Sequence, residues 1–448
     1  MGSKSDILVV GGGPAGIISA VTARRYYPDK KITLIKSVGN GCIPCGIPYM
    51  FSSLKDPDEN KLGNGALEKN SIDVFVDEVI EIDRKKKQII TKNGKNYGYE
   101  KLILAMGSLP AILPIQGIDK KGVYPIYKDM DYLKGAIADI KKTKNVLVLG
   151  GGFIGVEFAD EISKINGFNV YLVEIFPQLL ANSFDSEFSR IVEEKLKENG
   201  VNVLTDTKVE EIIGQDCVKK VRFSNGQELD IDSVILGVGV APNTKLAVDA
   251  GLDLGHGKGI WVDEYMRTID PNIFAVGDCV CKRDFFTRRS TPVMLASTAT
   301  AEARVAGANL YKLKIIRENK GTIAVYSTYI DGLMLGSAGL TENSAKKEGF
   351  EIVAGVACGV DKHPATLPGA SEVKVKLIFS RKSGIILGGQ VSGGMPCAEL
   401  INLIGVAIQK RMSSMELEML QMATHPFLTS APTTYPVVLA AQDATGKM

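Results

Sequence analysis

Two short apolar runs, each ending in glycines, mark the first half of the chain. Residues 7–16 have the sequence ILVVGGGPAG, and residues 146–155 have the sequence VLVLGGGFIG. Each apolar run is typical of a β-strand, and the spacing of apolar residues after the glycines is typical of a helix. The pattern predicts a strand, a glycine turn and a helix at both places, so one structural unit occurs twice.

Further apolar runs predict more strands. A second strand follows each glycine unit, at residues 31–36 (KITLIK) and 169–174 (NVYLVE). Three other apolar runs end in glycine-containing turns and lead the chain out of these units, at residues 101–110, 233–243 and 268–279.

The last third of the chain has a different pattern. Residues 372–391 alternate apolar and polar side chains on either side of a Ser-Gly turn, which predicts a β-hairpin. Residues 398–412 then carry apolar side chains at helical spacing, which predicts a helix.

Composition narrows the class of protein. The 448 residues correspond to about three domains at the usual domain size. A net charge of +2 disfavours a nucleic-acid or membrane-surface partner, and no apolar run approaches the length of a membrane-spanning helix. The chain enters its first strand without the pattern of a signal peptide. We therefore expect a cytoplasmic protein, in which stable structural disulfides are uncommon.

The glycines of both units follow the G-x-G-x-x-G spacing of dinucleotide-binding turns. The first two glycines of this motif allow a tight turn and the close approach of a ligand, and the third allows the helix and strand to pack closely. The N-terminus of the following helix then faces a pyrophosphate. These roles are predicted for Gly11, Gly13 and Gly16 in the first unit and for Gly150, Gly152 and Gly155 in the second.

The residue that ends each second strand indicates which nucleotide binds. A carboxylate at Glu174 can accept hydrogen bonds from both ribose hydroxyls and would repel a 2′-phosphate. Residues 175–185 contain no Arg or Lys, so we expect NADH rather than NADPH. In the first unit this place is taken by Lys36, which cannot accept such a bond, and we expect its side chain to point into solvent. Asp278 is placed to bind ribityl or ribose hydroxyls of a flavin nucleotide.

Residues 39–51, GNGCIPCGIPYMF, contain Cys42 and Cys45 in a C-x-x-C spacing. Such a pair is a structural disulfide, half of a metal site or a dithiol that passes electrons, and the expected location disfavours the first. A four-thiolate site needs a second well-spaced pair, and the other close pair is Cys279 and Cys281. We expect those two to be ordinary packed residues, and we expect no metal site.

Together these motifs resemble the FAD-dependent pyridine nucleotide-disulfide oxidoreductase family over essentially the whole chain. The resemblance implies an α/β fold with two Rossmann-like dinucleotide-binding domains, one for FAD and one for NAD, and a C-terminal α+β dimerisation domain. The implied boundaries are 1–114 and 241–320 for the FAD domain, 115–240 for the NAD domain and 321–448 for the dimerisation domain. The resemblance implies that FAD is bound at Gly11, Gly13, Gly16 and Asp278, and that NADH is bound at Gly150, Gly152, Gly155 and Glu174. The other residues predicted to bind a cofactor are Pro14, Ala15, Ala105, Gly107, Phe153, Ile154, Glu157 and Gly239.

Within this family, the stretch CGIPY is similar to the surroundings of the redox-active cysteine in one branch. That branch contains coenzyme A disulfide reductases, NADH oxidases and peroxidases, and persulfide reductases, and the match falls on Cys45. The branch usually has a single cysteine with Ser four residues before it, whereas here that place is Gly41 and Cys42 follows. The resemblance also implies that Phe153 covers the flavin until nicotinamide displaces it, and that Glu157 lies near the flavin.

Disulfide exchange needs a thiolate, so a useful cysteine needs a lowered pKa. We expect a helix that begins after Cys45 to lower the pKa of its thiol, and we expect Cys42 to resolve the mixed disulfide. The resemblance implies that the C-terminal segment reaches into the partner subunit's active site. His425 in that segment resembles the family's acid–base histidine, which would protonate the departing sulfur.

Coenzyme A is one candidate for the substrate. Segments 363–370 and 423–427 lack the tyrosines that coenzyme A reductases of this branch tend to have near the sulfur, which weakens that assignment. A basic cluster would either hold a coenzyme A phosphate or be a solvated helix end; its members are Arg24, Arg25, Lys30 and Lys31.

These observations predict a homodimeric FAD-dependent NADH:disulfide oxidoreductase. Its substrate would be a low-molecular-weight disulfide, persulfide or polysulfide, and electrons would pass from NADH through FAD to Cys45 and Cys42. Two alternatives stay open. One is an NADH oxidase or peroxidase that uses a sulfenic acid on Cys45. The other is a flavoprotein electron-transfer subunit of a larger complex.

Overall fold

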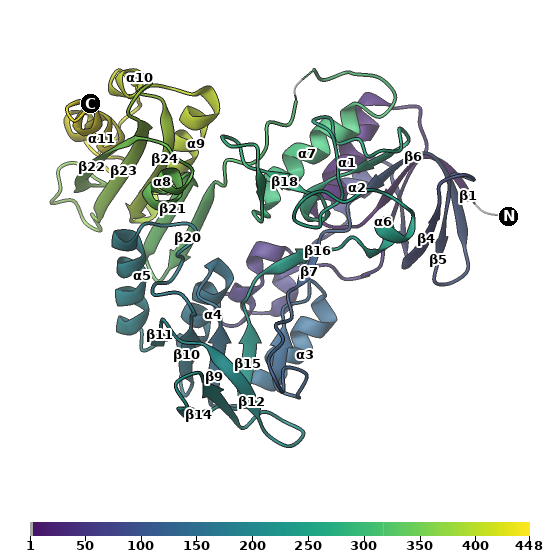
Figure 1. The fold of residues 1–448 in the computed structure, drawn as a ribbon, viewed down its shortest axis with the longest axis horizontal. Coiled ribbons are helices and arrows are strands. Elements are labelled where there is room, and N and C mark those ends of the chain that lie inside the picture. Colours follow the sequence, from purple (N-terminus) through teal and green to yellow (C-terminus); the bar gives the residue numbers. More distant parts are fainter. Residues whose placement is uncertain (1–2, 317) are drawn as a thin grey trace.

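The computed structural model describes residues 3–316 and 318–448, and three sheets organise them (Figure 1). The first two sheets contain parallel strands with helices packed on them, and the third is antiparallel. This arrangement confirms the predicted α/β fold with an α+β C-terminal part. Among the described residues, no helix combines the length and the apolar character that crossing a membrane requires.

The first sheet has the order β3-β2-β1-β6, with β17 pairing parallel to β6 and an antiparallel extension through β5 and β4. Its strands are β1 (Ser3–Val10), β2 (Ile32–Lys36), β3 (Asp73–Val76), β4 (Val79–Asp83), β5 (Gln88–Thr91), β6 (Asn96–Leu104) and β17 (Ile273–Ala275). The helices of this part are α1 (Pro14–Tyr26), α2 (Gly65–Lys69), α6 (Lys245–Asp249) and α7 (Ala296–Ala308).

The second sheet is parallel throughout and has the order β11-β10-β9-β15-β8. Its strands are β8 (Val123–Pro125), β9 (Asn145–Leu149), β10 (Asn169–Val173), β11 (Asn202–Leu204) and β15 (Ser233–Leu236). The helices are α3 (Met130–Ile140), α4 (Phe153–Ser163) and α5 (Ser186–Glu198). A small antiparallel sheet beside it contains β12 (Val209–Ile213), β13 (Lys220–Phe223) and β14 (Glu228–Asp230).

The predicted repeat is confirmed as a strand–turn–helix–strand unit in both sheets. In the first sheet, β1 and β2 pair in parallel, and α1 connects them along the chain. In the second sheet, β9 and β10 pair in parallel, and α4 connects them. The paired strands are almost completely buried, because helices cover the parallel sheets, and this explains their continuous apolar runs.

The chain passes between the two parallel parts twice, through neighbouring strands. Strands β7 (Ser108–Pro110) and β16 (Val240–Pro242) pair antiparallel and form a two-stranded link. The last short strands of the first part are β18 (Lys282–Arg283) and β19 (Ser290–Thr291). The domain boundaries given above stay a prediction.

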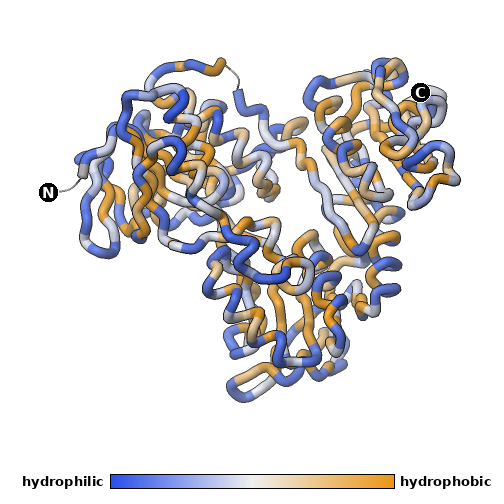
Figure 2. The backbone as a smooth tube through the Cα atoms, turned by 180° about the vertical axis from the view of Figure 1, so that it is seen from behind, coloured by the Kyte–Doolittle hydropathy of each residue, from blue (hydrophilic) through white to orange (hydrophobic). Residues whose placement is uncertain are grey.

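The C-terminal part has an antiparallel sheet in the order β20-β21-β24-β23-β22. The predicted hairpin is confirmed as β23 (Glu372–Ser380) and β24 (Ile386–Gly393), and the predicted helix as α9 (Leu400–Lys410). The other elements are β20 (Tyr326–Ile330), β21 (Leu333–Gly339), β22 (Ile352–Val360), α8 (Glu342–Lys347), α10 (Ser414–Glu418) and α11 (Pro436–Thr445). Figure 2 shows hydrophobic stretches along the central strands of each part and hydrophilic outer loops.

Candidate functional site

A single connected cavity of about 2320 Å³ joins both glycine turns, the cysteine segment and strand β20. It exceeds the roughly 300–1,000 Å³ of an ordinary small-molecule site, so it has room for more than one ligand. The sequence-predicted residues that line it are Gly11, Gly13, Pro14, Ala15, Cys42, Cys45, Ala105, Gly107, Gly150, Gly152, Phe153, Ile154, Glu157, Glu174, Gly239 and Asp278.

The first glycine turn has the geometry of a pyrophosphate cradle. Gly11 has a φ of +117°, and a Cβ there would meet the Ala105 carbonyl oxygen at 2.1 Å. Gly13 precedes α1, and no described atom lies within 4 Å of where its Cβ would be. Within the described chain, no side chain caps this end of α1, so its first N–H groups are available to an anion. Gly16 lies beneath the turn, where a Cβ would be 1.9 Å from the Gly11 oxygen.

The second turn repeats this geometry. Gly150 has a φ of +108°, and no described atom lies within 4 Å of a Cβ at Gly152. A Cβ at Gly155 would lie 1.8 Å from the Gly150 oxygen, so Gly155 contributes close packing rather than cavity lining. The described residues leave this end of α4 without a side-chain cap as well. Two cradles open on one cavity, which fits two dinucleotides.

Glu174 lies where the second cradle needs an acidic residue. Its carboxylate is almost buried and accepts hydrogen bonds from the Gly151 N–H at 2.6 Å and the Phe176 N–H at 2.9 Å. These bonds hold the carboxylate beside the turn and leave lone pairs for ribose hydroxyls. Lys208, which the sequence argument missed, also lines the cavity, because the Thr207 N–H donates to the Glu174 carbonyl and brings this segment alongside.

Lys36 does not point into solvent, so that expectation was wrong. Its side chain is 8% exposed, and Nζ donates to the Gly39 carbonyl and to Asn64 Oδ1, both at 3.0 Å. Burial lowers the pKa of this ammonium group. The aliphatic stem lies so close to Gly12 that a Cβ there would meet Lys36 Cδ at 2.7 Å, so Lys36 supports the first turn from below.

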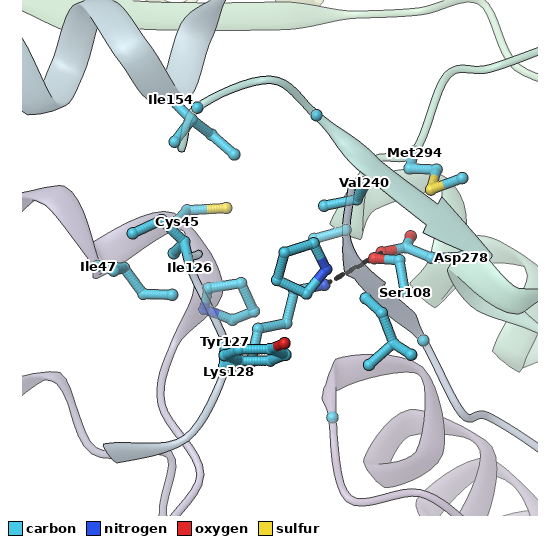
Figure 3. Close-up of a pocket in the computed structure, with 18 of the residues that line it drawn as sticks. Cys45, Ile47, Ser108, Ile126, Tyr127, Lys128, Ile154, Val240, Asp278 and Met294 are labelled. Atoms are coloured by element: carbon cyan, nitrogen blue, oxygen red, sulfur yellow. Dashed lines mark hydrogen bonds and ion pairs between the residues drawn. The ribbon is translucent and has the colours of Figure 1, made fainter. Parts of the chain in front are cut away.

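Asp278 is held by two residues that the sequence argument did not select. Ser108 Oγ donates to Asp278 Oδ2 at 2.8 Å, and Lys128 Nζ lies 3.3 Å from the same oxygen and 3.0 Å from Ser108 Oγ. Figure 3 shows the Lys128 side chain reaching toward Asp278, with Cys45 at the other side of the same space. The polar ends of this group face the cavity, where flavin hydroxyls are expected.

The cysteine segment differs from its prediction. Instead of a helix after Cys45, the segment forms two short 3₁₀ turns: Pro44–Gly46, which contains Cys45, and Pro48–Met50. Cys45 is exposed in the cavity, whereas Cys42 is buried among apolar side chains, and both are free thiols. Burial raises the pKa of Cys42 to about 11. Cys45 is open to the cavity, but the protein around its sulfur still partly desolvates the thiol. This desolvation and the nearby Glu157 carboxylate raise the pKa of Cys45, so the expected lowering was wrong. Lys128 opposes the rise at both sulfurs.

Phe153 and Glu157 lie on the first turns of α4 and face the cavity. The Phe153 ring stacks on Tyr326, with centroids 4.8 Å apart and planes at 20°. Glu157 Oε1 accepts a hydrogen bond from Thr328 Oγ1 at 2.8 Å. Burial raises the pKa of Glu157 to about 7, Thr328 opposes the rise, and Asp160 and Glu161 add to it.

His425 lies outside the described lining of this cavity. It is exposed on the C-terminal part, and its Nδ1 accepts a hydrogen bond from the Phe427 N–H at 3.3 Å. The structure of one chain therefore does not bring His425 to Cys45. Its predicted place in the partner subunit's site stays a prediction.

The basic cluster has structural partners. Arg24 donates to four backbone carbonyls, including those of Asn70 and Ser71, and Lys30 pairs with Asp6 and Glu100. These contacts with the protein itself favour the second alternative, a charged helix end without a ligand, over a coenzyme A phosphate site.

The second cysteine pair lies outside the lining described above. Cys279 is fully buried, as expected, and Cys281 is partly exposed and donates to the His256 carbonyl at 2.8 Å. Across residues 3–316 and 318–448, no group of three or more His, Cys, Asp or Glu side chains is arranged to hold a metal ion.

Comparisons with known proteins agree with this geometry. The profile of the family "Pyridine nucleotide-disulphide oxidoreductase" matches residues 5–303, and that of its dimerisation domain matches residues 325–436. The chain is 32% identical to an NADH oxidase of Methanocaldococcus jannaschii, over 98% of this chain and 99% of that protein.

Other relatives act on sulfur compounds. The chain is 31% identical to an NAD(P)H coenzyme A polysulfide/persulfide reductase of Pyrococcus horikoshii, over 87% of this chain and 88% of that protein. The solved structure of an NAD-dependent persulfide reductase from A. fulgidus matches with a TM-score of 0.91 at 30% identity, over 99% of this chain and 83% of that chain. With two nucleotide cradles, a cysteine in the cavity that they share and family matches over nearly its whole length, the chain belongs to the FAD- and NAD(P)H-dependent pyridine nucleotide-disulphide oxidoreductase family of enzymes.

Proposed function

We propose that the protein is an NADH:disulfide oxidoreductase that reduces a low-molecular-weight disulfide, persulfide or polysulfide through Cys45. The observation that carries this proposal is the exposed Cys45 thiol in the cavity that both glycine cradles share. A disulfide that enters the cavity can meet this sulfur, because the thiol is exposed there. The polysulfide and persulfide reductases among the relatives support this class of substrate.

When bound, FAD accepts a hydride from the nicotinamide and passes two electrons on to sulfur. The two glycine cradles would hold the dinucleotides, and Cys45 would face the cavity that the cradles share. In the overall reaction NADH and one proton reduce a disulfide to two thiols. Lys128 is the positive group that favours the Cys45 thiolate, which is the nucleophilic form of the side chain.

We further propose that Cys42 is the resolving cysteine, which attacks the mixed disulfide on Cys45. Its position three residues before Cys45 and its place in the same cavity lining support it. Its burial means that it becomes reactive only after the segment shifts or Cys45 reaches it.

An anaerobic reductive titration tests the Cys42–Cys45 centre. If Cys42 bonds to Cys45 in the oxidised enzyme, the wild type takes up two electron pairs per flavin, and Cys42→Ser takes up one because no disulfide forms. Cys217→Ser is the matched control, since Cys217 is exposed outside the cavity lining. Uptake of a single pair by the wild type would remove Cys42 from the mechanism.

The buried state of Cys42 favours a second candidate, an NADH oxidase or peroxidase. With Cys42 withdrawn among apolar side chains, Cys45 is the exposed sulfur and would persist as a sulfenic acid. The NADH oxidase of M. jannaschii among the relatives points the same way. Steady-state NADH consumption with oxygen, hydrogen peroxide or a disulfide as acceptor ranks the two candidates directly.

We propose NADH as the preferred nucleotide, because the carboxylate of Glu174 would repel a 2′-phosphate. Glu174→Gln keeps the size of the side chain and removes its charge. We expect the ratio of kcat/KM for NADH to that for NADPH to fall by about tenfold or more, a loss of one unfavourable charge contact. The ratio is its own control for folding, because both nucleotides are measured on one preparation. An unchanged ratio would assign selectivity elsewhere, with Lys208 the first residue to test.

We also propose a homodimer in which His425 serves the partner subunit. The dimerisation-domain match supports this assembly, as do two apolar side chains beside His425: Phe427 is 52% exposed and Leu428 is 63% exposed.

Coenzyme A derivatives are a candidate substrate class, in line with the name of one relative. One tyrosine does interact with the sulfur, because Cys45 is among the groups that raise the pKa of Tyr49, and both side chains line the cavity. The cytoplasmic location stays a prediction.

A further inference from the structure

Strand β20 brings two side chains of the C-terminal part onto the start of helix α4. Residues two apart in a strand point to the same face, so Tyr326 and Thr328 share one face of β20. Tyr326 stacks on Phe153, and Thr328 donates its hydroxyl hydrogen bond to Glu157. All four side chains line the cavity.

Ile330, the next residue on this face of β20, anchors the strand to the second parallel part. Ile330 is fully buried and belongs to the apolar core of the second parallel part rather than to that of the C-terminal part. Thr328 is itself 5% exposed. The two contacts are therefore held by a packed interface between two parts of the chain.

We propose that β20 is a positioning element for the binding and oxidation of NADH, in which Tyr326 holds the ring of Phe153 in the place that the nicotinamide must enter and Thr328 orients the carboxylate of Glu157. Neither residue of β20 is assigned a chemical step. The inference concerns only the reduction of bound FAD by NADH, so it does not depend on which acceptor the enzyme uses afterwards.

The seat for Phe153 follows from the position of that residue. Phe153 directly follows Gly152, so a nicotinamide nucleotide held at the second cradle must extend past this ring to reach the rest of the cavity. An offset stack between two aromatic rings is a favourable contact beyond simple burial. Tyr326 is a neutral phenol at physiological pH, and burial raises its pKa further, to about 12. Because the Phe153 ring stacks on Tyr326, a nicotinamide ring that enters here must compete with Tyr326 for contact with Phe153.

The carboxylate of Glu157 has several charged or titratable neighbours. On α4 these are Asp160 and Glu161, which raise its pKa and are themselves paired with Lys164. On the cysteine segment, Cys45 and Tyr49 interact with Glu157, and each has its pKa raised in part by this carboxylate. From β20, Thr328 supplies the opposing contact, a hydrogen bond that favours the charged form.

The first test is stopped-flow reduction of the FAD-loaded enzyme by NADH without oxygen or disulfide. Tyr326→Leu removes the stack, and we expect the NADH concentration for half-maximal rate to fall by about three- to tenfold while the limiting rate changes less. Tyr326→Phe retains the ring and should restore the wild-type value, which separates stacking from the hydroxyl group. An unchanged or raised half-saturation in Tyr326→Leu would overturn the seat for Phe153.

The second test uses the pH dependence of the same reduction. Thr328→Val has nearly the same shape but cannot donate, so the charged form of Glu157 loses a stabilising bond. We expect the midpoint of the pH profile assigned to Glu157 to rise by about one unit, and Thr328→Ser to restore it. The single variant Glu157→Gln shows which pH transition belongs to Glu157, because that transition should be absent from its profile. If Thr328→Val leaves the midpoint in place, the orienting role of Thr328 is wrong.

These tests are separate from the proposed function. A failure to reduce any disulfide would leave the rates of FAD reduction, and thus the role of β20, unaffected. Conversely, normal disulfide turnover in all β20 variants with unchanged FAD reduction would overturn this inference and leave the proposed function standing.

Discussion

Replacing Cys45 by Ser is expected to lower NADH-dependent disulfide reduction by at least about a hundredfold, because a serine hydroxyl at neutral pH is a far weaker nucleophile than a thiol. Bound FAD should still be reduced by NADH at close to the wild-type rate, since both glycine cradles stay intact. Turnover with the disulfide and stopped-flow FAD reduction, measured on one preparation, check both halves of this result.

Cys217→Ser is the matched control for the Cys45 variant. It makes the same change at an exposed thiol outside the cavity lining, and its turnover should stay at the wild-type level. If Cys45→Ser retained disulfide turnover, the Cys45 sulfur would not be the group that passes electrons from the flavin to the disulfide. A variant that lost only oxygen or peroxide reduction would instead favour the oxidase or peroxidase candidate.

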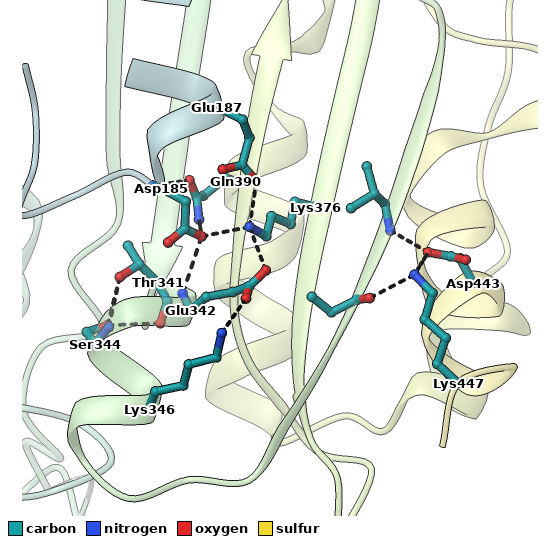
Figure 4. Close-up of polar contacts among 12 residues, drawn as sticks. Asp185, Glu187, Thr341, Glu342, Ser344, Lys346, Lys376, Gln390, Asp443 and Lys447 are labelled. Atoms are coloured by element: carbon teal, nitrogen blue, oxygen red, sulfur yellow. Dashed lines mark hydrogen bonds and ion pairs between the residues drawn. The ribbon is translucent and has the colours of Figure 1, made fainter. Parts of the chain in front are cut away.

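Lys376→Met is expected to destabilise the attachment of the C-terminal part by about 3 kcal/mol, the lower end of the range for breaking a buried ion pair. Figure 4 shows the Lys376 ammonium among three carboxylates. Its Nζ lies 3.0 Å from Asp185, 2.6 Å from Glu187 and 2.7 Å from Glu342. Lys376 and Asp185 are buried, so the substitution leaves a buried carboxylate without its cation.

The cluster joins different parts of the chain, which is why one residue has so large an effect. Asp185 precedes α5 of the second parallel part, whereas Lys376 and Gln390 lie on the central strands of the C-terminal sheet. Gln390 also exchanges two hydrogen bonds with Asp185. Thermal unfolding followed by circular dichroism should show a lower transition temperature for Lys376→Met.

Lys346→Met is the matched control for this prediction. Lys346 also contacts Glu342, at 3.0 Å, but its side chain is exposed, and exposed ion pairs contribute little to stability. We expect its free energy of unfolding to stay within about 0.5 kcal/mol of the wild type. Equal stability of the Lys376 variant and the control would show that the buried cluster does not hold the two parts together.

The effect of Lys376 should depend on pH. Burial alone would raise the pKa of Glu187 and Glu342, but hydrogen bonds and charge from Lys376 outweigh it and hold both pKa values below the usual range. A lowered pKa in the folded state stabilises the protein above the unfolded pKa, and this stabilisation is lost as the pH falls. The difference between wild type and Lys376→Met should therefore shrink below about pH 4.3, the ordinary pKa of Glu.

The sequence by itself determined the local features of the nucleotide cradles. Gly11 needs a positive φ, and Gly16 must lack a Cβ because it lies against the oxygen of Gly11, five residues earlier. Contacts of this kind lie within one strand–turn–helix unit, so residue spacing is enough to predict them. The alternating pattern of residues 372–391 predicted the hairpin for the same reason.

The error about the cysteine segment could not have been avoided from its prolines. A helix that begins after Cys45 would have Pro48 in its first turn, where proline is tolerated. In the structure the Met50 N–H instead bonds to the Ile47 carbonyl and the Phe51 N–H to the Pro48 carbonyl, which closes a 3₁₀ turn rather than an α-helix.

Only the tertiary structure decided which distant side chains meet around the cavity. The Lys36 ammonium group is buried where Asn64 Oδ1 accepts a hydrogen bond from it, and Lys128 reaches Asp278 although 150 residues separate them. Thr328 likewise meets Glu157 across 171 residues. The Lys128–Asp278 and Thr328–Glu157 pairs arise where different parts of the chain pack against one another, whereas Lys36 and Asn64 meet within the first parallel part. Residue spacing does not predict any of these contacts. The sequence therefore specified the family and both cradles, whereas the electrostatic surroundings of Cys45 and Glu157 came from the contacts between the parts.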